Sequence, residues 1–378
     1  MQGADSRLQP LKRSGESGAG QVDGHSGLLS GPASHERRGH NNRGTAGIRT
    51  NQVRAGATRD PGKACIALAN WLWTSDFVVE DNIVLVKKTG HRFTLDLKLW
   101  HDIFTWFCFY TAANMWRLSR RLSGHKPPTI AFLPDKPRPW YLIWPVMQCA
   151  GAKQIDDASQ ADIVMQFDDS TTCEPQLPDL SNRQRKVRTV NFNCRDVSKS
   201  TVSAAFERVA GYALAVDPTI YRGPIVDKSE VNAAHDGRVI QGPIERVSGR
   251  SYQRLVDNEI EGGLVEDLRT CTVNGECVIV FRKRRPLSRR FANENVSVDW
   301  VRPEAVYSPA EIDLIRRFAK EIKLDWGGVD VLRSRQDGRI YIVDANKTDM
   351  GPPVALPLGQ KLRATRLLAR AFGTAFAP

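Results

Sequence analysis

Residues 327–353 read "GGVDVLRSRQDGRIYIVDANKTDMGPP" and set two apolar runs on either side of a glycine-containing turn. The turn "SRQDGR" (334–339) favours a hairpin, in which the start of one strand lies beside the end of the other. Asp330 is then expected near Asp344 and Asn346, and the latter two point to one face because strand side chains alternate. An unpaired buried carboxylate is costly, so the pattern predicts a cation at this hairpin.

Two carboxylates and an amide oxygen make a set of hard oxygen ligands. Mg²⁺ prefers such ligands, takes few of them from the protein, and completes its shell with water and phosphate. Our hypothesis is that Asp330, Asp344 and Asn346 hold a magnesium ion carried on a nucleotide. The alternative interpretation is that these residues only cap strand ends and form turns.

Bulk composition narrows the class of protein without naming it. The 378 residues predict two or three domains, and 41% hydrophobic content is typical of a globular chain. The net charge of +12 keeps nucleotides, nucleic acids and membrane surfaces open as acidic partners. The seven cysteines show no C-x-x-C pair and no zinc spacing, and the N-terminal sequence has no apolar core of a secretory signal. We therefore expect a cytoplasmic protein with free thiols.

The chain divides into four predicted regions. Residues 1–60 contain no aromatic residue and are expected to form a disordered basic arm, either a solvated leader or a contact for nucleic acid or lipid. Residues 61–125 are expected to hold a hairpin (82–97) and an aromatic-rich helix (95–122) that ends in "RLSRRL". That composition is typical of a helix lying in a membrane interface and also of a helix packed beneath the next domain.

The remaining two regions carry different strand patterns. Residues 126–197 alternate strand, helix and strand, with strands at 129–135, 161–169 and 187–193, which predicts a small parallel α/β domain. Residues 198–378 contain short strands separated by Gly or Asn turns, among them 224–229 and 264–273, which predict an antiparallel sheet. Helices are predicted after a cap at Ser198 or Ser200, at 308–324 with Ser308 as N-cap and Glu311 three residues later, and at 359–372. No G-x-G-x-x-G follows any strand, so the dinucleotide fingerprint is absent from the sequence.

The opening stretch resembles the closing metal motif of the ATP-grasp superfamily, where an Asp or Glu on one strand and a Glu-x-Asn on the next hold the Mg²⁺ of ATP. In this sequence Asp344 stands where the family usually has Glu. The resemblance covers roughly residues 220–353. It implies an α/β (α+β), ATP-grasp-like fold, in which the small parallel domain precedes an antiparallel-sheet nucleotide-binding domain.

The resemblance also implies roles for upstream residues. The strand "GPIVDKS" is similar to the one whose lysine contacts ATP phosphates, and residues 230–237 would take the place of the mobile lid. The stretch "SYQRLVDN" is similar to the strand and hinge that bracket adenine, and two arginines further on would neutralise phosphate or acyl-phosphate. The residues implied are Lys228 for phosphate, Gln253 and Leu255 for adenine, and Arg269 and Arg282 for catalysis.

The leading functional hypothesis is a ligase that uses ATP and Mg²⁺ to join a carboxylate to an amine or thiol through an acyl-phosphate. The basic stretch "FRKRRPLSRRF" (281–291) is either a solvated face or a contact for an acidic or phosphorylated small-molecule substrate. Two alternatives remain open: a small-molecule kinase with the same ATP site, and a non-catalytic basic protein that binds nucleic acid or membrane. No nucleic-acid-binding motif is present, so specific nucleic-acid binding is not expected, and peripheral membrane contact is a minor expectation.

Overall fold

The computed structural model describes residues 77–87, 92–124, 126–175, 177–178, 187–232, 234, 236–292 and 295–376. Contacts between Cα atoms divide the chain into Met1–Leu68 and Ala69–Pro378, and every described residue belongs to the second unit. The predicted disordered arm, residues 1–60, lies outside the described residues.

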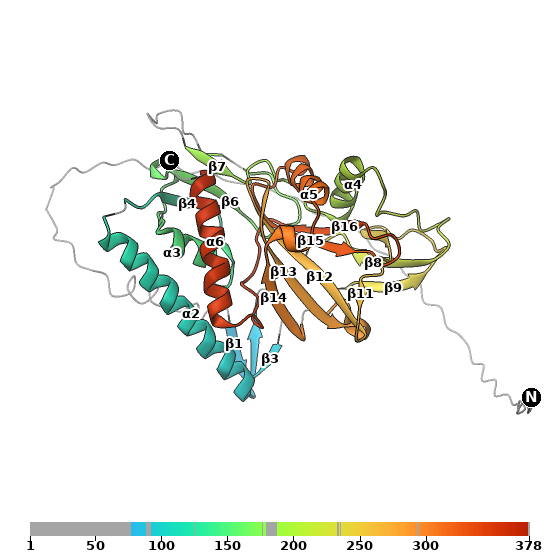
Figure 1. Cartoon of the computed structure of the whole chain (residues 1–378), viewed down its shortest axis with the longest axis horizontal. Coiled ribbons are helices and arrows are strands. Elements are labelled where there is room, and N and C mark those ends of the chain that lie inside the picture. The colour runs from blue at the N-terminus through green and yellow to red at the C-terminus, as the bar shows by residue number, and fades with distance from the viewer. Residues whose placement is uncertain are drawn as a thin grey trace, which may run out of the picture. The chain divides into compact units, whose positions relative to one another are not determined.

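A small antiparallel sheet and a long helix begin the described part of the chain. The sheet has the strand order β1-β2-β3: β1 (Phe77–Glu80), β2 (Ile83–Val86) and β3 (Arg92–Thr94). The helix α2 (Leu97–Leu122) starts at Asp96, whose Oδ1 accepts a hydrogen bond from the backbone N–H of Leu99 at 2.7 Å. It packs through Phe109 and Ala113 against α3 (Ile143–Ala150) and α6 (Leu358–Phe376) (Figure 1). No helix within the described ranges is long and apolar enough to span a bilayer.

The predicted small parallel sheet is present and has four strands. Its order is β5-β4-β6-β7, and every neighbouring pair is parallel. All five residues of β6 are buried, as expected for a strand in a sheet covered on both faces. A 3-10 turn, η2, precedes β6. The elements are β4 (Thr129–Pro134), β5 (Lys153–Gln154), η2 (Ala158–Gln160), β6 (Ile163–Phe167) and β7 (Arg188–Val190).

Two antiparallel sheets follow, joined to helix α4 (Lys199–Ala210), which starts at the N-cap Ser198. The first sheet has the order β10-β8-β9, and the second has the order β14-β13-β12-β15-β16 with β11 paired to β12. The strands of the first are β8 (Pro224–Ser229), β9 (Arg238–Gln241) and β10 (Arg250–Arg254). The strands of the second are β11 (Glu259–Ile260), β12 (Leu264–Val273), β13 (Glu276–Pro286), β14 (Ser297–Val301), β15 (Trp326–Arg333) and β16 (Ile340–Asn346).

The larger antiparallel sheet has an apolar core on each face. One core joins it to α4 and α5 (Pro309–Glu321), and the other joins it to α3, α6 and the parallel sheet. The capping box predicted from Ser308 and Glu311 is formed: Ser308 Oγ accepts from Glu311 N at 3.3 Å, and Glu311 Oε2 accepts from Ser308 N at 2.8 Å. Short 3-10 turns lie at η3 (Leu287–Arg289) and η4 (Pro303–Ala305).

Asn191 fastens the end of the parallel sheet to the start of β15. The residue is fully buried and has a φ of 63°, a left-handed conformation that asparagine tolerates. Its Oδ1 accepts from the backbone N–H groups of Asp325 and Trp326, both at 2.9 Å, and its Nδ2 donates to Trp326 O at 2.8 Å. One side chain thus sets where β15, the strand that carries Asp330, enters the sheet.

Candidate functional site

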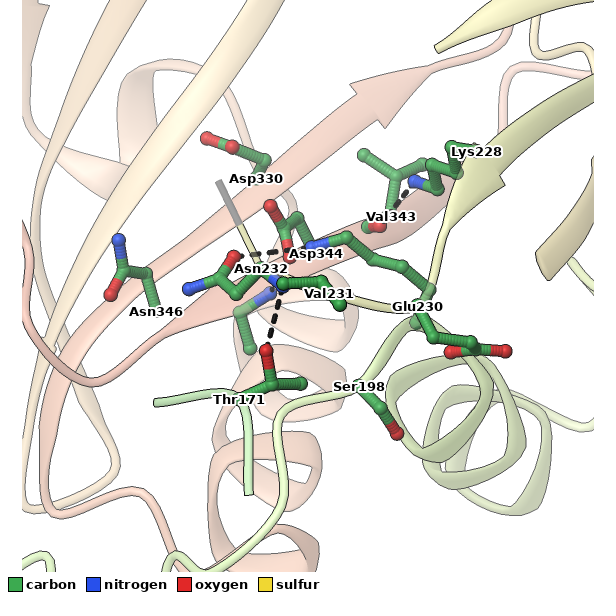
Figure 2. A network of polar contacts seen from close by, with 12 residues as sticks. Thr171, Ser198, Lys228, Glu230, Val231, Asn232, Asp330, Val343, Asp344 and Asn346 are labelled. Atoms are coloured by element: carbon green, nitrogen blue, oxygen red, sulfur yellow. Dashed lines mark hydrogen bonds and ion pairs between the residues drawn. The ribbon is translucent and has the colours of Figure 1, made fainter. Parts of the chain in front are cut away.

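The hairpin places Asp330 directly opposite Asp344. The two residues are paired across β15 and β16, and the register shifts between Asp330 and Val331. A bulge of this kind bends the strand and redirects side chains. Asn346 lies two residues further along β16, opposite Gly328. Figure 2 shows Asp330 and Asp344 on the neighbouring strands and Asn346 beyond them. The juxtaposition predicted from the turn is therefore present.

Arg269 of β12 lies against this acid pair. It is buried and forms ion pairs with Asp330 Oδ2 at 2.9 Å and with Asp349 Oδ1 at 2.5 Å. A Cβ at Gly328 would lie 2.3 Å from Asp349 Oδ2 and 2.6 Å from Arg269 Nε, so the close Arg269–Asp349 pair requires glycine there. Burial opposes the charged forms, but the facing charges prevail: the pKa of Arg269 is well above its usual value, and that of Asp330 falls to about 2.

The donor atoms fit a magnesium ion through two carboxylates. Asp330 Oδ1 is buried and has no hydrogen-bond partner among the described residues, which leaves an oxygen available to a cation. Asn346 Oδ1 already accepts from Thr348 N at 2.8 Å and Thr348 Oγ1 at 3.2 Å, so its lone pairs serve a turn. In the described part of the chain, no group of three or more His, Cys, Asp and Glu residues is placed so that it could hold a metal ion. Two carboxylates, with water and phosphate, still match the preference of Mg²⁺.

Lys199 is a site residue that the sequence reasoning missed. This buried lysine donates to Asp344 Oδ1 at 2.5 Å and to Asn232 Oδ1 at 3.2 Å. It is the first residue of α4, where the helix dipole disfavours a cation, so a nearby carboxylate is needed to hold it there. The sequence does place a lysine directly after the N-cap of a predicted helix, which is an unfavourable position for a cation and could have indicated a nearby acid. The sequence does not show which acid that is.

Lys228, the lysine predicted to contact phosphate, lies at the same place. Its Nζ donates to the backbone carbonyl of Val343 at 3.0 Å, as Figure 2 shows. Burial lowers the pKa of Lys228 to about 8; Asp344 opposes that shift, and the charge of Lys199 adds to it. Near neutral pH the group is therefore a cation that can give up its proton within a small pH change.

The two residues predicted to bracket adenine have different surroundings. Gln253 is buried, and its Nε2 donates to Ser203 Oγ of α4 at 2.9 Å. Leu255 is half-buried, and its backbone N–H donates to Pro224 O at 3.3 Å. The Gln253 side chain thus holds β10 to α4, and only Leu255 keeps a partly exposed side chain.

The structure does not bring Arg282 to the acid pair. Residues opposite one another on antiparallel strands share a face, and Arg282 pairs with Leu268, one position away from Arg269. Its guanidinium binds Asp299 through two contacts of 2.7 Å. Lys283, which pairs with Asp267, lies on the Arg269 face instead. The alternation of side chains along β13 therefore puts Lys283, not Arg282, on the side of the carboxylates.

Most of the basic stretch 281–291 is engaged within the protein. Its arginines contact acidic or amide groups of neighbouring strands and loops. The contacts are Arg282 with Asp299, Arg284 with Glu266, Arg285 with Asp267, and Arg290 with Asn258. The hypothesis of an acidic substrate at this stretch therefore depends mainly on Lys283.

The segment predicted to take the place of the lid, residues 230–237, is tied to α4 through Glu230. Glu230 accepts from Ser200 N at 2.9 Å and from its hydroxyl, so an anion sits at the positive end of the helix. Asn232 N donates to Thr171 Oγ1 at 2.7 Å, and Figure 2 shows these residues beside the acid pair. Residues 233 and 235 lie outside the described residues.

A cavity of about 330 Å³ lies elsewhere, on the other face of the β8–β10 sheet. It is lined by Asp227, Arg238, Arg250 and Tyr252, among others. Asp227 is the neighbour of Lys228 and points to the opposite face of β8. This cavity is separate from the acid pair.

Among solved structures, the chain is similar to ATP-grasp ligases. The ATP-grasp ligase PsnB in complex with a minimal precursor has 14% identity and a TM-score of 0.43, and the match covers 66% of this chain and 100% of that one. A RimK domain ATP-grasp protein from Sphaerobacter thermophilus has 12% identity, coverage of 65% and 99%, and a TM-score of 0.39. D-alanine–D-alanine ligase from Bacillus anthracis has 12% identity and a TM-score of 0.40, and the match covers 66% of this chain and 97% of that one.

No family model and no curated protein sequence matches the chain. The mixed α/β architecture predicted from the sequence, a small parallel sheet followed by antiparallel sheets, is present in the structure.

Proposed function

We propose that this protein is an ATP- and Mg²⁺-dependent ligase that joins a carboxylate to an amine or thiol through an acyl-phosphate. The observation that carries the proposal is the acid pair Asp330–Asp344, placed on adjacent strands and surrounded by buried or half-buried cations. These cations come from separate elements: Lys199 from α4, Lys228 from β8, Arg269 from β12 and Lys283 from β13.

The charges suit a polyphosphate held with a metal ion. Mg²⁺ bound by Asp330 and Asp344 would offset phosphate charge, which is the chemistry a metal supplies in phosphoryl transfer. Lys228 and Lys199 lie next to Asp344 and provide ammonium groups for phosphate oxygens. Arg269 holds Asp330 in place, because its guanidinium binds Asp330 and Asp349 at once. In the proposal adenine lies beside Leu255.

The reaction needs no protein nucleophile. An oxygen of the substrate carboxylate forms a bond to the γ-phosphorus of ATP while the bond to ADP breaks, which gives an acyl-phosphate. The amine or thiol then bonds to the acyl carbon, and inorganic phosphate leaves with the proton of the attacking group. In the first step charge is spread over the oxygens of the phosphoryl group and the leaving ADP, and fixed cations such as Lys228 and Lys283 would lower the energy of this transition state.

The organisation of the chain is part of the proposal. Residues 126–197 would form the small preceding domain and residues 198–378 the ATP-grasp-like domain, with residues 61–125 as an N-terminal addition. A cytoplasmic location would give the enzyme its ATP.

A thermal-shift experiment tests the nucleotide site. ATP and Mg²⁺ are added separately and together, because a ligand that binds only the native state raises the melting temperature by mass action. We expect the largest shift with both, and no shift with Mg²⁺ and ATP together would refute the proposal. With candidate acids and amines, a ligase releases ADP and free phosphate. Phosphate retained on the product would instead identify a small-molecule kinase.

A further inference from the structure

Helix α2 carries an apolar stripe on the side that faces away from the protein core. Its buried side chains are Phe109 and Ala113. Large apolar side chains recur every three or four residues in the first and the second half of the helix, with Thr111 between the two groups, and they share the face opposite the buried one. Its members are Trp100 (58% exposed), Phe104 (64%), Phe107 (66%), Met115 (60%), Leu118 (48%) and Leu122 (80%).

So many large apolar side chains exposed along one helix are unusual. Single exposed apolar residues are common on protein surfaces, but a contiguous row of large ones marks a binding surface. The row runs from Trp100 to Leu122 and therefore extends for about 33 Å at a rise of about 1.5 Å per residue. The opposite side of α2 packs on α3 and α6 (Figure 1). The helix is therefore held in place while the side chains of the stripe are exposed.

Arginines gather around the C-terminal half of α2. At 3.6 residues per turn Arg121 lies beside the stripe, whereas Arg117 and Arg120 lie towards the packed side of the helix. Arg117, Arg120 and Arg121 belong to α2, and Arg366 and Arg370 extend from α6. From Ile103 to Leu122, and throughout α6, the sequence contains no Asp or Glu. Among the described residues, none of these five arginines forms an ion pair with a carboxylate.

The contacts that these arginines do make leave their charge uncompensated. Arg117 donates to the amide oxygen of Gln148 at 2.9 Å, and the guanidinium of Arg366 lies 4.0 Å from the ring centre of Trp116. Arg120, Arg366 and Arg370 line a small hollow beside Trp116. Such a group of cations would attract anions strongly, because no neighbouring carboxylate balances it.

We propose that α2 docks on an anionic phospholipid surface, with the stripe in the acyl-chain boundary and the exposed arginines Arg121, Arg366 and Arg370 on lipid phosphates. A helix of this kind lies in the plane of the membrane, and apolar burial combined with a basic patch gives stable binding where either alone is weak. Arginine pairs well with phosphate, because its guanidinium can bind two oxygens at once. Trp100, at the start of the stripe, has the amphipathic ring that favours the headgroup region.

Charge favours lipid over a second copy of the chain. Two copies paired in parallel would bring their arginine-rich ends together. In an antiparallel pair each of those ends would meet the start of the other copy's helix, where Lys98 offsets part of the charge of Asp96 and Asp102. An anionic lipid surface offers the opposite charge along the whole stripe. This inference goes beyond the proposed ligase activity and does not depend on it.

Vesicle co-sedimentation of the full chain tests the docking surface. Vesicles of phosphatidylcholine alone are compared with vesicles in which one third of the lipid is phosphatidylglycerol. We expect binding to the anionic vesicles that weakens as salt is raised. The double variant Phe104→Ser/Phe107→Ser should weaken this binding by about tenfold or more, because two apolar anchors are lost. Arg121→Gln/Arg370→Gln should weaken it by about tenfold on anionic vesicles only.

Matched controls separate the stripe from general surface effects. Ile220→Ser removes an apolar side chain that is 74% exposed away from α2, and Arg302→Gln/Arg335→Gln removes two exposed charges elsewhere. Both controls should bind vesicles as the unaltered chain does, and melting temperatures should show that all variants fold. Absence of binding to anionic vesicles, or full binding by the phenylalanine variant, would overturn the proposal. So would a dimer in sedimentation velocity that the phenylalanine variant dissociates, if no vesicle binding accompanies it.

Discussion

Lys199 and Asp344 form an ion pair of 2.5 Å that joins the first residue of α4 to the edge strand β16, 145 residues apart in the sequence. The same Asp344 oxygen is a ligand in the magnesium hypothesis. Lys199 and a metal ion therefore compete for one carboxylate. When a nucleotide brings Mg²⁺, Lys199 is released towards the phosphates in the proposed function. The first two predictions follow from this competition.

Replacing Asp344 with Asn removes one charge from the site and nearly preserves its shape. We expect the fold to persist with a lower melting temperature, because the buried Lys199 loses its charged partner. Turnover should fall roughly a thousandfold, since metal-assisted stabilisation of the transition state is worth several kcal/mol. The measurement is the thermal shift with Mg²⁺ and ATP together, followed by the rate of ADP release.

Asp344→Glu is the matched variant, because it restores the acid usual in the similar family. Activity retained or raised in this variant supports a working metal site. If Asp344→Asn leaves the joint thermal shift intact, Asp344 has only a turn-forming role, which would cost about 1 kcal/mol of stability and no nucleotide affinity.

Lys199→Met should change the responses to metal and nucleotide in opposite directions. Without the competing ammonium, Mg²⁺ alone should raise the melting temperature more than it does in the unaltered chain. ATP affinity should fall by about tenfold, the loss expected for one charge-assisted hydrogen bond. Calorimetric titration with each ligand measures both. Lys199→Arg keeps the charge, so its affinities for Mg²⁺ and ATP should lie between those of the unaltered chain and of Lys199→Met. If Lys199→Met changed both affinities in the same direction, the proposed competition would be contradicted.

The pKa of Lys228 predicts a pH dependence with a definite sign. The group titrates at about 8 in the folded protein against 10.5 in its ordinary state. Between these values the unfolded chain binds a proton that the folded chain lacks, so the contribution of Lys228 to stability rises with pH from about 8 to about 10.5. In urea unfolding, the free energy of unfolding of the wild-type chain should rise relative to that of Lys228→Met as the pH increases across that window.

The same titration has the reverse effect on nucleotide binding. Phosphate is attracted by the ammonium form, so ATP affinity should fall as the pH rises above about 8. Lys228→Arg keeps its charge throughout and should lack this decline. An identical pH profile in both proteins would remove Lys228 from the phosphate site.

Neighbouring cations on β13 should behave differently when each is neutralised. Lys283→Gln should raise the Kd for ATP by several-fold, because Lys283 lies on the face of Arg269 and Asp330. Arg282→Gln should leave that Kd unchanged and lower stability by about 0.2–1 kcal/mol, as expected for a partly exposed ion pair with Asp299. Nucleotide titrations and thermal melts on both variants decide the point. A larger effect of Arg282→Gln on ATP binding would reverse the assignment of faces.

Asn191→Ala should be among the most destabilising single substitutions in the chain. It leaves the buried backbone groups of Asp325 and Trp326 without partners, and each such group costs about 1–3 kcal/mol. Asn191→Gly loses the same hydrogen bonds but relieves the backbone at a φ of 63°, so it should be less harmful than alanine by about 1 kcal/mol. Denaturant unfolding of both variants provides the comparison.

The sequence determined those parts of the protein that depend on local pattern. Strands β8 and β12 have the predicted limits, Pro224–Ser229 and Leu264–Val273, because period-two patterns and turn residues act within a few positions. The pairing of Asp330 with Asp344 followed from one short turn between adjacent strands. The capping of α5 by Ser308 is likewise local.

Only the tertiary structure decided which charges meet. Lys199 contacts Asp344, which is 145 residues away in the sequence, and Asn191 binds the start of β15 from 134 residues away. No local sequence pattern encodes such distant partners. The face of β13 that carries Lys283 rather than Arg282 depends on its register with β12. Likewise, composition left α2 open as either a packed helix or an interfacial one, and the fold shows that one side is packed while the apolar stripe lies outside. Charge and apolar content are written in the sequence, but which side faces a partner is set by packing between elements.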